Sequence, residues 1–162
     1  MNKEEAVYRI LDEMGMSYMV HEHPPVYTVE EARRHAAGIE GAHCKNLFLR
    51  NRKGDRHYLL IAECDRPVKL KELRRHVNEK QLSFASPERL LEHLGLTPGS
   101  VSPFGLINND RADVIVLIDR DLVHYGRVNF HPNINNLTIT ISFTDLLRFI
   151  DECGNSYRLI EL

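Results

Sequence analysis

The sequence predicts a single α+β domain in which helices flank a mixed β-sheet. The chain has 162 residues, a length that suits one hydrophobic core and is short for two domains. Helical and strand patterns follow one another irregularly, whereas a regular alternation would indicate a parallel α/β sheet. The run DVIVLI, residues 113–118, is almost entirely aliphatic and rich in β-branched residues, which is typical of a buried central strand.

The N-terminal part of the sequence predicts two helices and three strands. The expected elements are a helix from the capping residue Asn2 to Glu13, a strand over 17–22, a second helix over 29–36, and a hairpin of strands over 46–50 and 58–63. Apolar residues at helical spacing support the first helix, and Gly15 ends it. Thr28 followed by Glu31 is the pattern of a capping box, which opens the second helix. Gly54 in NRKGDR supplies the hairpin turn.

The C-terminal part predicts three more helices and three more strands. The expected elements are a basic helix over 69–76, a helix from Ser86-Pro87 to Gly95, strands over 113–118, 137–142 and 156–162, and a helix over 145–153 capped by Thr144. Proline at the first helical position and glycine after the last residue mark both ends of the middle helix. The segment LTPGSVSPFG is rich in Pro, Gly and Ser and is predicted to be a loop.

Composition restricts the class of protein. The net charge is −2, while a protein that coats nucleic acid without specificity needs a strong basic excess. We therefore expect no DNA partner, although a small basic face could still meet one RNA end. The three cysteines, Cys44, Cys64 and Cys153, form no C-x-x-C, which argues against a disulfide framework or a zinc ribbon. The sequence has no signal-peptide pattern and no apolar run of the roughly 20 residues that cross a membrane. We expect a cytoplasmic protein with no membrane partner.

Three polar segments are candidates for a functional site, and the first is GAHCKNLFL, residues 41–49. Lys45 stands where a loop is expected to become an apolar strand, beside Asn46. An ammonium group at a strand end can bind a phosphate or polarise a carbonyl. The alternative is a lysine that extends into solvent at the end of a strand.

The second candidate segment is PGSVSPFGLINND, residues 98–110. Gly99, Ser100 and Ser102 predict a tight loop with free backbone N–H groups. Such loops can hold a carboxylate, a phosphate or a developing oxyanion, and glycine lets the backbone approach a ligand. The alternative is an ordinary surface loop.

The third candidate segment is GRVNFHPNINN, residues 126–136. Asn129, His131 and Asn133 are crowded around a proline, and amides with one imidazole suit the hydrogen bonding of a polar substrate. His131 could also act as a general base, because an unperturbed histidine titrates near neutrality. The alternative is that Asn and Pro form a turn before the next strand.

Other chemistries have weaker support. His21 with His23, and His43 with Cys44, do not supply the three or four convergent ligands of a metal site, so we expect no metal. A hydrolase that uses Cys44 as nucleophile, with His131 as base, is a further alternative. The basic helix carries Lys69, Lys71, Arg74 and Arg75, which could contact RNA phosphates or could form a solvated face.

Together, five segments resemble the YbaK/ProX editing domain, and the resemblance runs over nearly the whole chain. The segments are HPPVYTVEEA (23–32), the Lys45-Asn46 pair, PGSVSPFGLIN (98–108), FHPNINNLTITIS (130–142) and the following DLLRFI. The resemblance implies a compact α+β domain over residues 1–162, without metal or other cofactor. It implies hydrolysis of the ester of mischarged proline tRNA, with prolyl-tRNA synthetase as a possible partner. The long form of the 98–108 segment resembles the alanine-specific branch.

Two kinds of alternative stay open. The same enzyme class could act on cysteine, serine or threonine instead of alanine, and the same fold could bind a tRNA end or a synthetase without catalysis.

The resemblance also implies roles for individual residues. Lys45 matches the essential lysine, Gly99 and Ser100 belong to the catalytic loop, and His131 matches the histidine that follows the long strand. The positions implied to bind substrate are Tyr27, Thr28, Asn46, Val101, Ser102, Phe104, Asn129 and Asn133. This chain departs from the family near its C-terminus, where Gly154-Asn155 stands in place of Gly-His.

Overall fold

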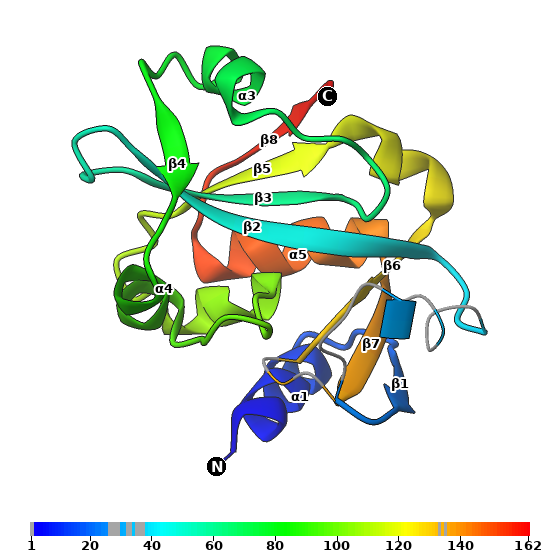
Figure 1. The fold of residues 1–162 in the computed structure, drawn as a ribbon. Coiled ribbons are helices and arrows are strands. Elements are labelled where there is room, and N and C mark those ends of the chain that lie inside the picture. Colours follow the sequence, from blue (N-terminus) through cyan, green and yellow to red (C-terminus); the bar gives the residue numbers. More distant parts are fainter. Residues whose placement is uncertain (1, 26–29, 32–33, 35–37, 133, 135) are drawn as a thin grey trace.

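The computed structural model describes residues 2–25, 30–31, 34, 38–132, 134 and 136–162, and in these residues eight strands form one mixed sheet (Figure 1). The strands are β1 (Met19–Glu22), β2 (Ala42–Asn51), β3 (His57–Glu63), β4 (Leu82–Phe84), β5 (Ile115–Asp119), β6 (Arg127–Phe130), β7 (Leu137–Ser142) and β8 (Tyr157–Ile160). The α-helices are α1 (Lys3–Glu13), α3 (Leu70–His76), α4 (Pro87–Leu94) and α5 (Phe143–Cys153). Two 3₁₀ helices are η1 (Pro103–Asn108) and η2 (Arg120–Tyr125). The predicted α+β class is confirmed.

The strand β2 connects the two parts of the sheet. The strands of the sheet lie in the order β1-β7-β6-β2-β3-β5-β8, and β4 pairs with β2 outside that order. Antiparallel pairs join β2 to β3, β6 to β7 and β1 to β7, whereas β2–β6, β3–β5 and β5–β8 are parallel. With ten residues, β2 is long enough to pair with β6 near its start and with β4 near its end.

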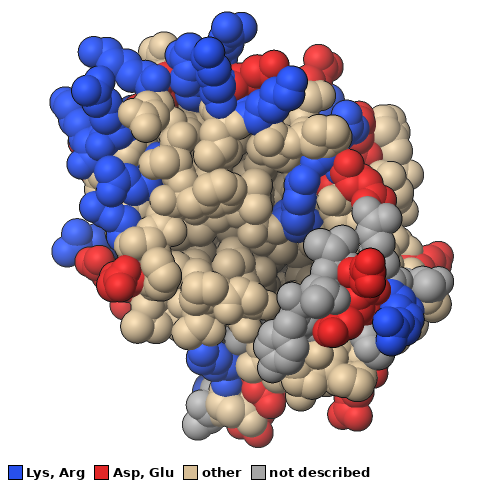
Figure 2. Space-filling view, in the orientation of Figure 1, with Lys and Arg blue, Asp and Glu red and all other residues tan. Residues whose placement is uncertain are grey.

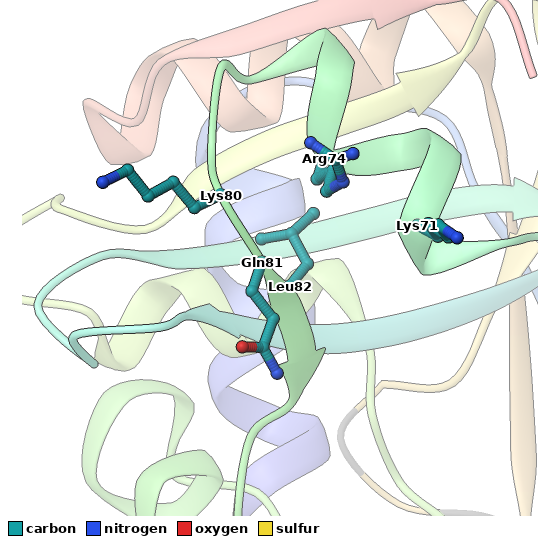
Figure 3. A pocket seen from close by; sticks show the side chains of 5 residues that line it. All are labelled: Lys71, Arg74, Lys80, Gln81 and Leu82. Atoms are coloured by element: carbon teal, nitrogen blue, oxygen red, sulfur yellow. The ribbon is translucent and has the colours of Figure 1, made fainter.

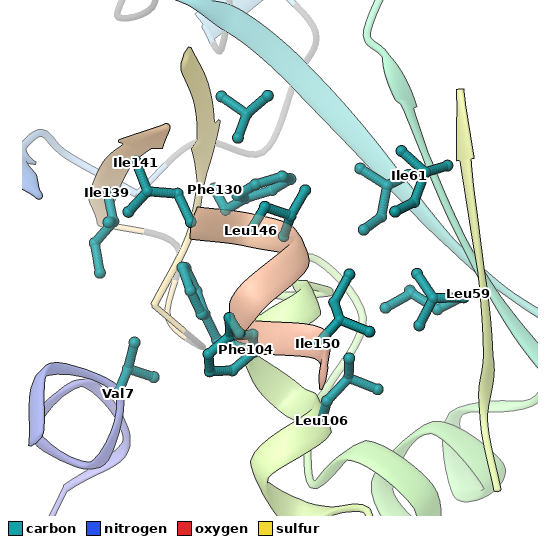
Figure 4. Packing of buried hydrophobic residues seen from close by; sticks show 14 of the residues in the cluster. Val7, Leu59, Ile61, Phe104, Leu106, Phe130, Ile139, Ile141, Leu146 and Ile150 are labelled. Carbon is teal, nitrogen blue, oxygen red and sulfur yellow. The ribbon is translucent and has the colours of Figure 1, made fainter. Parts of the chain in front are cut away.

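The sheet has a hydrophobic core on each face. Leu59 and Ile61 of β3 point into the larger core, which α1, α4, α5 and η1 complete. Figure 4 shows Phe104 and Leu106 of η1 packed with Leu146 and Ile150 of α5 and with residues of several strands. Tyr58 and Leu60 of β3 point to the other face, where Leu73 of α3 closes a smaller core. Burial on both faces explains why the central strands are almost continuously apolar.

The structure corrects several expected elements. The segment 137–142 forms a strand with the predicted bounds, but β4, β6, η1 and η2 were not expected. The cap of α5 is Ser142, whose Oγ accepts from the Asp145 N–H at 3.1 Å, and not Thr144, which is the second residue of the helix. The helix expected over 29–36 lies mostly outside the described residues.

Asn155, where the chain departs from the family that it resembles, stabilises the fold. It is 5% exposed, and its Nδ2 donates to the Val114 carbonyl at 2.9 Å and to Asn109 Oδ1 at 3.0 Å. The same Asn109 oxygen accepts from the Val114 N–H. These bonds tie the segment after α5 to the residues just before β5, so the amide has a structural role.

The corrected cap of α5 can be tested directly. We expect Ser142→Ala to lower the free energy of unfolding by about 1 kcal/mol, because an N–H of the first turn loses its acceptor. Thr144→Ala is the matched control and should change stability by less than half of that. Chemical denaturation of the two variants measures both values, and a larger loss for Thr144→Ala would contradict the assignment.

A histidine pair lies beside the β2–β3 hairpin. The His57 side chain stacks on Phe48 with ring centroids 5.5 Å apart and lies 4.0 Å from the His93 ring. Arg89 Nη1 is 3.1 Å from His57 Nε2, and arginine can only donate, so Nε2 is unprotonated. Burial, together with the neighbouring His93 and Arg89, lowers the pKa of His57 to about 4.

This shift predicts a pH dependence of stability. Below pH 6.5 the unfolded chain binds a proton at His57 before the folded protein does. The stabilisation is therefore complete above about pH 6.5 and is lost as the pH falls toward about 4, with a slope of at most about 1.4 kcal/mol per pH unit. Denaturation at several pH values should show a smaller slope for His57→Gln than for wild type, and an unchanged slope for the exposed control His124→Gln. Equal slopes in all three proteins would contradict the assignment.

Candidate active site

The middle of β2 has a neighbouring strand on only one side. β3 pairs with residues 44–50, but in the described structure the other side is paired only at 42–43 by β6 and at 49–51 by β4. The backbone N–H and C=O of one strand residue point to the same edge of the strand, and those of the next residue point to the opposite edge. The Phe48 carbonyl accepts from the Ala85 N–H on the β4 side, so the Asn46 backbone groups face the unpaired edge. Figure 2 shows the surface hollowed just below β2, between β4 and β6. We call this edge, residues 44–47, with its hollow the β2 notch.

Lys45 and Asn46 project from β2 on opposite faces of the sheet. Lys45 shares the α3 face with Leu47, and its Nζ donates to the backbone carbonyl of Arg66. Asn46 has the opposite orientation, and its buried Oδ1 has no hydrogen-bond partner in the described structure. Because the edge between them is open, a ligand in the plane of the sheet can reach both side chains. The expectation that Lys45 stands at the start of the strand was wrong, since β2 begins at Ala42.

A buried carboxylate anchors the turn that receives the Lys45 side chain. Asp119, 1% exposed at the end of β5, has its Oδ2 3.4 Å from Arg66 Nε. It also accepts from the backbone N–H groups of Glu63 and Asp121, and the Arg66 guanidinium pairs with the Asp121 carboxylate. The Arg66 carbonyl that binds Lys45 is thus held from two sides. The sequence analysis missed Arg66 and Asp119; the only signal was a carboxylate directly after an aliphatic run.

The loop over 98–102 connects α4 to η1. Gly99 is exposed and has φ of +90°, a backbone conformation that favours glycine. The Ser100 N–H donates to the Thr97 carbonyl at 3.1 Å and closes a turn. Ser102 is fully buried, and its Oγ accepts from the Phe104 N–H at 3.1 Å. The Ser102 side chain therefore caps η1, contrary to its expected role in substrate binding.

Two further side chains expected to bind substrate are buried in the interior of the protein. Phe104 is 0% exposed, and its ring meets those of Phe130 and Phe149 edge to face. Asn129 is 3% exposed; its Nδ2 donates to the Glu40 carbonyl at 3.0 Å and its Oδ1 accepts from the Thr140 hydroxyl. Both polar ends of Asn129 are used by the protein, so the amide holds the segment before β2 instead of a ligand.

His131 lies where β6 leaves β2. The parallel pairing of these strands ends at His43 and Asn129, and His131 directly follows the last residue of β6. His131 Nδ1 is 2.9 Å from the Leu137 carbonyl, an acceptor, so Nδ1 carries the proton and Nε2 keeps a lone pair. Burial lowers the pKa of His131, and the neighbouring His23 ring adds to this effect. A neutral imidazole that accepts a hydrogen bond is the expected form at pH 7.

The remaining expected residues have different positions. Tyr27, Thr28 and Asn133 lie outside the described residues, and Val101 is partly buried against the larger core. Among the described residues, the close group of three potential metal ligands is Glu63, Cys64 and Asp65, which contains none of the histidines considered above. No helix in the described part of the chain is long and apolar enough to cross a membrane.

The basic helix α3 contributes to a second hollow. Lys71 and Arg74 of α3 line a depression of about 480 Å³ with Lys80, Gln81 and Leu82 at the start of β4 (Figure 3). We call these five residues the basic hollow. Lys69 and Arg75, also expected to contact phosphates, are exposed but do not line it.

Burial makes Cys44 a poor nucleophile. Its Sγ is 3.6 Å from the Ala42 carbonyl, and burial raises the pKa of the thiol well above its usual range. The thiolate is the nucleophilic form of cysteine, so little reactive species is present at neutral pH. The alternative hydrolase with Cys44 and His131 loses its chemical basis.

Comparison with known proteins identifies relatives over the whole chain. The family described as aminoacyl-tRNA editing domain matches residues 23–149. The protein named prolyl-tRNA editing protein ProX from Acetoanaerobium sticklandii is 43% identical over 164 residues, which cover 100% of this chain and 99% of the relative. Prolyl-tRNA synthetase associated domain-containing protein 1 from Danio rerio is 39% identical over 133 residues, covering 81% of this chain and 72% of the relative.

Solved structures share the fold. A candidate trans-editing enzyme for prolyl tRNA synthetase matches with a TM-score of 0.76 at 22% identity, covering 100% of this chain and 98% of the other. The protein APE2540 matches with a TM-score of 0.73 at 18% identity, covering 96% of this chain and 97% of the other.

Thiol alkylation tests the state of Cys44. At pH 7 we expect iodoacetamide to modify the exposed Cys64 rapidly and Cys44 slowly, because burial keeps Cys44 protonated. Cys153 should also react slowly, since burial raises its pKa to about 11. Peptide mass spectrometry follows the three sites, and Cys64→Ser is the control that removes the fast site. Rapid modification of Cys44 would restore the cysteine nucleophile as an explanation.

Proposed function

The chain belongs to the aminoacyl-tRNA editing domain family, and on that premise we propose that it hydrolyses the ester of mischarged proline tRNA, with alanine as the amino acid removed. Residues 1–162 act as one editing domain that works in trans beside prolyl-tRNA synthetase, in the cytoplasm where tRNA is charged. The observation that carries the proposal is the β2 notch, where a lysine ammonium and an unpaired asparagine oxygen flank an open strand edge.

The β2 notch suits an aminoacyl ester for three reasons. The Lys45 ammonium can bind the terminal phosphate or polarise the ester carbonyl, since among the described residues its acceptor is one backbone carbonyl. The buried Asn46 Oδ1 needs a donor, and the α-amine of the amino acid supplies one. The Asn46 backbone N–H and C=O point to the same edge and can hold the amino acid in an extended position.

Hydrolysis then needs a water molecule and a site for the developing negative charge. The water oxygen bonds to the ester carbon, and collapse of the tetrahedral oxyanion breaks the bond to the ribose oxygen. One proton of the water ends on that ribose oxygen and the other passes to solvent, which leaves a free ribose hydroxyl and the amino-acid carboxylate. Because Ser100 N–H already donates to Thr97, the N–H groups of Gly99 and Val101, for which no described residue provides an acceptor, are the donors for this oxyanion. The neighbouring ribose hydroxyl positions the water. His131 Nε2 accepts a hydrogen bond from the ribose or the α-amine.

The choice of alanine as the amino acid removed follows from selection by two sites of different size. A synthetase site built for proline discriminates against a smaller side chain by only about 1–3 kcal/mol for each missing methylene. A second, smaller site can hydrolyse what the first admits, while proline is too large to enter. The form of the 98–108 loop, which resembles the alanine-specific branch, supports alanine over cysteine.

The first test is hydrolysis of proline tRNA charged separately with alanine, cysteine and proline. We expect rapid loss of alanine alone from the wild-type protein. Lys45→Ala should lower kcat/KM on alanyl-tRNA by about 100-fold or more, because one charged group that stabilises the transition state is removed. Lys3→Ala, an exposed lysine on α1, is the matched control and should retain wild-type activity.

Each contrary outcome has a distinct meaning. Loss of cysteine in place of alanine would keep the reaction and overturn the specificity. No hydrolysis of any substrate, with tRNA binding intact, would favour a binding module. Wild-type activity in Lys45→Ala would remove the lysine from the mechanism.

A further inference from the structure

Phe84 is an aromatic side chain that the fold leaves in solvent. It ends β4, is 62% exposed, and pairs with Leu49 of β2. Paired residues of adjacent strands project on the same face of the sheet, and Leu49 has the same orientation as Lys45 because they are four residues apart. Leu82, two residues before Phe84, is buried in the core under α3, which confirms the face. Phe84 and Lys45 therefore lie on the same face of the sheet.

The basic hollow adjoins Phe84 on that face. Leu82 belongs to the hollow and is about 7 Å along β4 from Phe84. Lys71, Arg74 and Lys80 contribute three cations, and none forms an ion pair with a carboxylate among the described residues. Figure 2 shows Lys and Arg gathered over α3, β4 and the β2–β3 hairpin, on a protein whose net charge is −2. The positive charge is thus concentrated near one exposed aromatic ring.

We propose that the unpaired 3′ end of the tRNA runs along β4, with phosphates in the basic hollow and one base stacked on Phe84. The inference rests on the proposed function and identifies how its substrate is held outside the β2 notch. A basic groove with an exposed aromatic ring is the combination that binds single-stranded nucleic acid, because every base has a π face. An apolar peptide would match the ring but not the three cations beside it.

The spacing along β2 selects which nucleotide meets Phe84. Leu49, its partner, is four residues from Lys45, a distance of about 13 Å along the strand. An RNA strand with the ~3.4 Å spacing of stacked bases needs about four nucleotides to cover this distance, and an extended strand needs fewer. Phe84 therefore stacks with a base upstream of the terminal adenosine, whose ester lies at the β2 notch.

Binding of uncharged RNA tests this surface without relying on catalysis. The two probes are a proline tRNA transcript with its complete 3′ end and the same transcript without its last four nucleotides, the number that spans the distance from the β2 notch to Phe84. We expect Phe84→Ala to raise Kd for the complete transcript by about 5- to 100-fold, the usual effect of removing one stacked base. Phe84→Trp should restore binding, and neither variant should change Kd for the shortened transcript. Leu91→Ala on α4 removes a side chain that is 57% exposed and is the matched control.

The basic hollow has its own readout. Lys71→Gln, Arg74→Gln and Lys80→Gln combined should weaken binding and reduce the slope of log Kd against log salt by about 2, because three phosphate contacts are lost. Arg9→Gln, on α1 at the opposite end of the molecule, is the charge control and should leave the slope unchanged (Figure 1). Thermal unfolding checks that each variant is folded.

Two results would overturn the proposal. One is a Kd for the complete transcript that Phe84→Ala leaves unchanged; the other is an equal loss of binding for both transcripts, which would indicate a structural effect. Either result is compatible with deacylation by the wild-type protein. Conversely, specific binding through Phe84 without deacylation would refute the proposed function and leave this surface intact.

Discussion

The incomplete pairing of β2 is the constraint on which the rest of the structure depends. Among the described strands, β2 alone joins β3 to β6, so the two parts of the sheet meet along it. On the side of β2 away from β3, pairing with β6 ends at His43 and pairing with β4 begins only at Leu49, which leaves the backbone between them without a partner strand on that side in the described structure. Unpaired strand edges are normally protected because they invite association with other chains. Here a short edge with a lysine and an asparagine is well suited to a small polar ligand.

Most polar residues around this edge form hydrogen bonds within the protein. Asp119 and Arg66 fix the turn that binds Lys45, while Asn129 joins β6 to the segment before β2. These groups have their hydrogen bonds satisfied inside the protein. Asn46 Oδ1 has no partner among the described residues, and a buried polar atom without one costs stability, typically about 1–3 kcal/mol. A donor from the proposed substrate would remove this cost.

The two faces of the sheet have different tasks. The larger core under α5 supplies most of the buried apolar surface, so it carries the stability of the domain. The smaller core under α3 is covered by one seven-residue helix, whose outer side brings cations beside β4. Lys45 belongs to this second face, which places the candidate catalytic lysine and the basic surface on the same side of the molecule.

The sequence by itself determined the fold class, most helices and the strands over 58–63 and 137–142, because period and capping are local properties of the chain. It also identified Lys45, the loop at Gly99 and the α3 cations as chemically unusual. Only the tertiary structure showed where these residues lie relative to the open edge of β2. β4 has three residues and β6 has four, which is too short for a clear local pattern. The gap between the places where β6 and β4 pair with β2 nevertheless creates the notch. Burial likewise turned Ser102, Phe104 and Asn129 from expected ligand contacts into structural residues, because contacts such as Asn129 with Glu40 join residues far apart in sequence.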